Sequence, residues 1–107
     1  MTDWLKKAEE SLDDLIATDR QLAELRVKWE RDKRKAKRTW SAILLRSEGS
    51  VEAKKAQAET HEQYRTAEAA EMTSLLEYEA LKGRRDTNRL VIEFWKSYQK
   101  AVREGEV

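Results

Sequence analysis

The chain has 107 residues, of which 40% are charged and 7% are aromatic, and its formal net charge is +1. This composition favours long solvated helices or a coiled coil over a thick globular core, in a single domain over residues 1–107. No run of about 18 apolar residues occurs, so no membrane-spanning segment is expected. The absence of cysteine excludes disulfides and thiolate metal sites and favours a cytoplasmic location.

Two proline-free runs with helical periodicity lie on either side of a short polar stretch. The first helix is predicted over about residues 3–46 and the second over about residues 51–104, with a turn at residues 47–50. Gly49 suits a left-handed helix end because it has no Cβ. Ser50 suits the N-cap of the following helix because its hydroxyl can accept from a free backbone N–H. The sequence therefore predicts an all-α antiparallel helical hairpin that resembles a coiled coil.

Apolar residues recur at heptad spacing from the start of the first run. The repeat begins with Leu5, Ala8, Leu12 and Leu15, and Ile16 widens it. This stripe is expected to face the second helix as the seam of the hairpin.

The second run has a similar stripe, which includes Met72, Tyr78 and Leu81. Residues 83–88 interrupt it with Gly, Asp, Thr and Asn, which have low helix propensity. Two outcomes stay open: the helix continues to about residue 104, or it breaks here and residues 90–103 form a third helix. Continuity is favoured because no proline forces a stop.

The charges alternate in sign along the chain. Residues 1–24 have a net charge of −4, residues 25–46 of +7, residues 47–81 of −5 and residues 82–107 of +3. Folding at Gly49 places the +7 block against the −5 block and the −4 block against the +3 block. Charge therefore favours the antiparallel orientation, although each exposed pair adds only a few tenths of a kcal/mol.

A hairpin of this length buries little surface by itself. Association into a larger bundle supplies the missing burial, so a homodimer with a four-helix arrangement is expected.

The most apolar segment of the chain lies near its C-terminus. Its aromatic residues are expected to extend beyond the cover that the first helix provides, apart from Trp4, and such exposed clusters usually mark interfaces. The predicted partner-binding residues are Trp4, Phe94, Trp95, Tyr98 and Val102. The leading hypothesis is a non-enzymatic interaction protein that binds itself and a protein partner through this segment.

An alternative function follows from the basic residues that accompany Trp29 and Trp40. Basic side chains neutralise phosphates and indole rings stack on unpaired bases. Both tryptophans fall on the apolar stripe, so they are expected to be core residues, whereas the outer basic side chains stay available. The nucleic-acid-binding residues of this alternative are Lys28, Arg31, Arg34, Lys35 and Arg38.

Catalytic and cofactor motifs are missing from the sequence. The three glycines stand apart, so there is no Gly-rich phosphate loop, and His61 is the only histidine. The stretch from His61 to Arg65 begins like a zinc-binding HExxH motif but lacks the second histidine. We expect neither an enzyme, nor a metal, nor a cofactor.

The stretches Leu22–Glu30 and Ile92–Ser97, within a charged hairpin free of proline and cysteine, give the chain its overall look. In composition it resembles small coiled-coil proteins of tailed bacteriophages and prophages. The resemblance implies a setting in the host cytoplasm. Proteins of this kind often belong to recombination or replication regions or act on host proteins. It assigns no activity and no functional residue.

Overall fold

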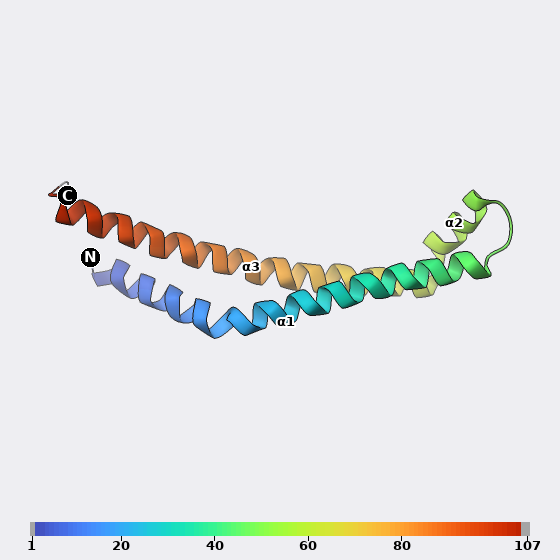
Figure 1. The fold of residues 1–107 in the computed structure, drawn as a ribbon, viewed down its shortest axis with the longest axis horizontal. Coiled ribbons are helices and arrows are strands. Elements are labelled where there is room, and N and C mark those ends of the chain that lie inside the picture. The colour runs from blue at the N-terminus through green and yellow to red at the C-terminus, as the bar shows by residue number, and fades with distance from the viewer. Residues whose placement is uncertain (1, 106–107) are drawn as a thin grey trace. The chain divides into compact units, whose positions relative to one another are not determined.

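The computed structural model describes residues 2–105, and the side chains of residues 3–105. This part of the chain contains three helices, α1 (Thr2–Arg46), α2 (Val51–Thr60) and α3 (Glu62–Arg103), and no strand (Figure 1). The predicted all-α antiparallel hairpin is confirmed. The dimer and the single domain stay predictions.

The turn between α1 and α2 uses the residues that suit such a turn. Gly49 has φ +108°, a conformation that L side chains rarely adopt. Ser50 is the N-cap of α2, and its Oγ accepts a hydrogen bond from the Ala53 N–H at 3.1 Å.

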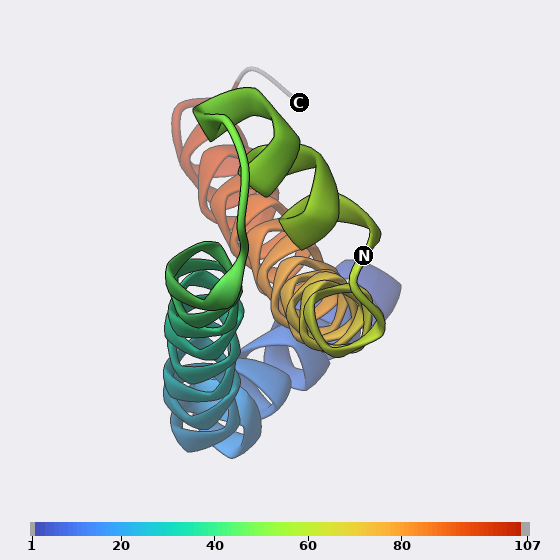
Figure 2. The ribbon, with the colours of Figure 1, turned by 90° about the vertical axis from the view of Figure 1, so that its right-hand side faces the viewer.

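The expectation of one helix over residues 51–104 is wrong at His61. There the backbone is extended, with φ −69° and ψ 132°, and α2 ends. His61 Nδ1 accepts from the Gln63 N–H at 3.1 Å, so the imidazole caps the first turn of α3. Figure 2 shows α2 set at an angle to the start of α3. A histidine is an unusual cap, and no proline or glycine marks this position in the sequence.

The break considered for residues 83–88 does not occur, because α3 runs through them. Thr87 Oγ1 donates to the Gly83 carbonyl at 3.1 Å, and Arg89 pairs with Asp86 at 3.1 Å. Packing against α1, to which Arg84, Arg85 and Asn88 are hydrogen-bonded, outweighs the low propensity of the stretch.

The contacts divide the chain into two compact units. Unit 1 joins the residues up to Ala23 with those from Glu79 onward, and unit 2 is Glu24–Tyr78. In each unit a segment of α1 runs antiparallel to a segment of α3.

The buried residues of both units are mostly small or polar. Buried apolar residues are Ala8 and Leu81 in unit 1, and Ala36, Ile43, Ala58 and Ala67 in unit 2. Ser11, Thr18, Ser74 and Arg85 are buried with them. The expected heptad seam is correct in part: Ala8 and Leu81 are buried and Leu15 and Tyr78 are half-buried, but Leu5, Leu12, Ile16 and Met72 are exposed. Buried polar side chains such as Ser11 and Thr18 take the places in the helix contact that Leu5 and Leu12 were expected to fill.

Candidate interaction surfaces

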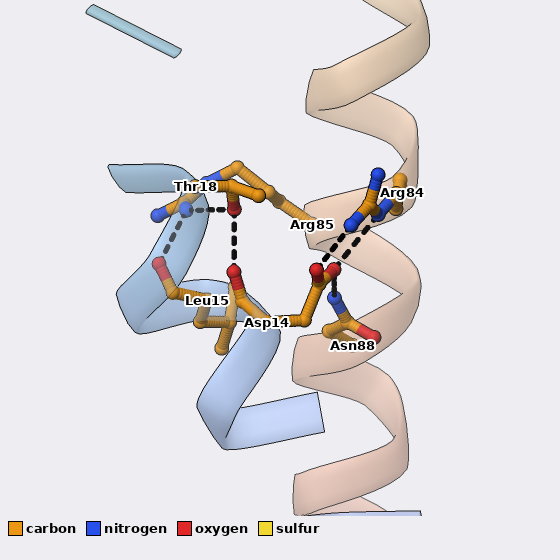
Figure 3. A network of polar contacts seen from close by, with 6 residues as sticks. All are labelled: Asp14, Leu15, Thr18, Arg84, Arg85 and Asn88. Atoms are coloured by element: carbon orange, nitrogen blue, oxygen red, sulfur yellow. Dashed lines mark hydrogen bonds and ion pairs between the residues drawn. The ribbon is translucent and has the colours of Figure 1, made fainter. Parts of the chain in front are cut away.

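A polar network fixes the register of unit 1 (Figure 3). Arg85 on α3 is only 5% exposed. Its Nη1 donates to the Leu15 carbonyl at 2.7 Å and to Thr18 Oγ1 at 2.8 Å. Its Nη2 lies 3.1 Å from Asp19 Oδ1. A buried cation needs such partners, so the network specifies one alignment of the helices.

The second part of the network is centred on the Asp14 carboxylate. Arg84 binds the Asp14 carboxylate through Nε at 2.8 Å and through Nη2, and Asn88 donates to Oδ2 at 2.6 Å. The hydrogen bond from Arg84, followed by that from Asn88, holds the pKa of Asp14 below its ordinary value of 3.8. The Asp14 carboxylate also raises the pKa of Arg84. Both groups therefore stay charged at neutral pH.

The aromatic end of unit 1 is partly covered. The rings of Trp4 and Phe94 lie 4.5 Å apart, and those of Trp95 and Tyr98 stack at 6.2 Å. Trp4 remains 36% exposed, Phe94 48% and Val102 40%. Trp95 and Tyr98 are half-buried. The structure thus brings Trp4 to the C-terminal segment, and apolar surface remains open there.

An open groove of about 300 Å³ lies next to the same cluster. It is lined by Trp95, Gln99, Val102 and Arg103. An aromatic ring, an aliphatic side chain and a guanidinium in one groove suit an apolar side chain that carries a polar tip.

The predicted basic residues lie together on one exposed face of α1 in unit 2. Lys28 is bound to Glu77 on α3, with Nζ 3.3 Å from Oε2. Arg31, Arg34 and Arg38 form no ion pair with any residue of the described chain. Lys35 lines an open groove near the start of α3, together with His61. The returning helix therefore neutralises only part of this face.

Trp29 and Trp40 pack inside unit 2. Trp29 stacks on Tyr78 with ring centroids 5.7 Å apart, and Trp40 meets Tyr64 edge-on at 5.1 Å. Both tryptophans are half-buried, so the expectation that they are core residues holds in part, and each indole already packs on a tyrosine ring.

Tyr64 also has a polar partner in unit 2. A hydrogen bond with Glu68 raises the pKa of Tyr64 above its ordinary value, and burial and nearby carboxylates add to the rise. The phenol is thereby kept neutral beside Trp40.

Among the described residues, no group of three or more His, Asp or Glu side chains is placed to hold a metal ion. None of the helices described is long and apolar enough to cross a membrane.

Sequence reasoning missed the Arg85 network and the cap at His61. A signal for Arg85 was present: it falls four residues after Leu81, in line with the apolar stripe. A cation at such a position usually extends to water, and only the positions of Thr18 and Asp19 on α1 show that it stays buried.

No protein-family model matches the chain, and neither a curated protein nor a solved structure is similar to it.

Proposed function

We propose that the chain is a non-enzymatic helical interaction protein. It associates with itself and with a protein partner through the aromatic end of unit 1, where Trp4, Phe94, Trp95, Tyr98 and Val102 gather. The observation that carries the proposal is Phe94, which keeps 48% of its surface exposed despite its contact with Trp4. Exposed aromatic side chains around a groove are typical of protein interfaces.

The thin core supports the same function. Among the described apolar side chains of unit 1, only Ala8 and Leu81 are buried, whereas several large apolar residues stay exposed. Covering them by protein gains about 25 cal/mol for each Å² of apolar surface removed from water.

The test replaces both Phe94 and Trp95 by Ala. Self-association, measured by sedimentation velocity, and capture of a protein partner are expected to weaken while the helical circular-dichroism signal is kept. The matched control replaces Leu45 and Val51, two exposed apolar residues of unit 2, by Ala. If assembly and capture are the same in all three proteins, the aromatic end is ordinary intramolecular packing and the proposal fails.

A second function is nucleic-acid binding by the basic face of unit 2, as an accessory to phage recombination or replication. The exposed side chains of Arg31, Arg34 and Arg38, without ion-pair partners among the described residues, favour it. With Lys35 they could neutralise about four phosphates, so binding should fall steeply with salt.

Fluorescence anisotropy with labelled single- and double-stranded DNA tests this second function. Replacing Arg31, Arg34 and Arg38 by Glu should abolish binding, whereas Lys28→Glu should have a smaller effect because Lys28 is engaged by Glu77. Binding that ignores the triple replacement rules this face out.

The proposed setting is the cytoplasm, and that of a bacterial host if the chain is encoded by a phage. The compositional resemblance to small coiled-coil proteins of phages is its support.

A further inference from the structure

Two stripes of uncharged residues in unit 1 are largely exposed, and the first of them is apolar. The first, on α1, consists of Leu5, Leu12 and Ile16, and Leu12 is 51% exposed. Spacings of seven and four residues place the three side chains on one helix face.

The second stripe is a seam on α3 in which seven successive positions are uncharged. It consists of Ala80, Gly83, Thr87, Leu90, Phe94, Ser97 and Ala101. All are exposed except the half-buried Ala101, and Leu90 keeps 64% of its surface in solvent. Alternating steps of three and four residues are the a/d spacing of a coiled coil, here over about 32 Å.

The ion pairs of the network define two sides of the helix pair in unit 1. Arg84 binds Asp14, whereas Arg85 reaches Asp19. Asp14 and Asp19 are five residues apart, about 140° around α1, so they flank the buried line through Thr18 from opposite sides.

The two stripes belong to different sides. Ile16 precedes Asp19 by three residues, so the α1 stripe lies on the Asp19 side. On α3, Arg84 follows Ala80 by four residues and precedes Thr87 by three, so the seam borders Arg84 on the Asp14 side. One added helix therefore cannot cover both stripes.

Two charged rows on α3 accompany the stripes. Lys82, Arg89 and Lys96 share the helix face of Arg85, and so lie on the side of the α1 stripe. Glu79, Asp86 and Glu93 each directly precede a seam residue. Both rows repeat every seven residues, and their signs are opposite.

We propose that the α1 stripe of one copy packs on the α3 seam of a second copy. The inference rests on the self-association proposed above and names its faces. With the α1 stripe antiparallel to the seam, the basic row of one copy faces the acidic row of the other, and Arg89, which pairs with Asp86 of its own helix at 3.1 Å, borders this contact. Pairing two seams in antiparallel orientation would instead bring two acidic rows together. Because the paired faces differ and lie on opposite sides, the contact is heterologous, and each added copy leaves one stripe free for another.

A complementation experiment tests this pairing. Leu12→Glu charges the α1 stripe, Leu90→Glu charges the α3 seam, and both positions are exposed enough for the hairpin to fold. Wild-type protein should show a mass that rises steadily with concentration in sedimentation velocity. Each variant alone should associate about tenfold or more weakly, but an equimolar mixture should form a one-to-one dimer, because each variant supplies the face that the other has lost.

Val27→Glu, at an exposed apolar position of α1 outside both stripes, is the control and should associate like the wild type. If either Leu12→Glu or Leu90→Glu alone assembles like the wild type, or if their mixture stays monomeric, the pairing is wrong even though self-association stands. If the wild type itself is monomeric at all concentrations, the self-association proposed above is wrong, and the pairing is wrong with it.

Discussion

At the scale of single residues, unit 1 is specified by polar contacts more than by apolar volume. Arg85 lies in the position of a core side chain, and Leu15 and Thr18 supply its acceptors. Removing a buried donor leaves those acceptors unsatisfied, which costs more than losing an exposed pair.

Arg85→Ala should therefore lower the free energy of unfolding by about 2–3 kcal/mol, as measured by urea denaturation. The neighbouring Arg84→Ala, whose side chain is 59% exposed, should lower it by less. Equal losses in the two variants would mean that burial of Arg85 is not what distinguishes them.

The carboxylate of Asp14 should contribute a pH-dependent stability. Its folded pKa lies below the ordinary value of 3.8, so its contribution is present above that pH and is lost as pH falls through the folded value. Thermal melting of wild type and Asp14→Asn should differ at neutral pH, and the gap should close as pH falls from about 5 to 2. A gap that stays constant would contradict the ion pair with Arg84.

At the scale of elements, the sequence predicts the main turn well because Gly49 and Ser50 each have a local conformational role. The end of α2 at His61 is less predictable, since histidine has no strong preference for a helix cap. The choice of buried face also escapes prediction: Leu5 and Ala8 both fit the heptad pattern, but only Ala8 is buried.

Two glycines should respond to Ala in opposite directions. Gly49→Ala forces a side chain into φ +108° and should cost about 1–2 kcal/mol. Gly83 lies within α3, where an added Cβ meets nothing within 4 Å, so Gly83→Ala should stabilise the helix by about 0.5–1 kcal/mol. Chemical denaturation at low protein concentration measures both, and a change of the same sign in the two variants would refute this reading of the backbone.

The cap at His61 should be replaceable by another side-chain acceptor. His61→Ala removes the acceptor for the Gln63 N–H and should cost about 0.5–2 kcal/mol in thermal unfolding. His61→Asn can accept the same bond and should stay close to the wild type. If the two variants are equally stable, the imidazole has no capping role.

At the scale of the whole molecule, composition and charge blocks were sufficient for the helical class and the antiparallel direction. The candidate surface at Phe94 and Trp95 was also visible as an apolar cluster, but the contact with Trp4 was needed to show how much of it stays open. The seam on α3 could not be predicted from the sequence, because its small residues form a recognisable stripe only once the buried side of the helix is known.

The measurement that tests the central claim most directly is sedimentation equilibrium of the wild-type chain over a wide range of concentrations. If further copies of the chain cover the exposed apolar surface, the average mass should rise with concentration above the 12.6 kDa of one chain. A mass of 12.6 kDa at every concentration would contradict it.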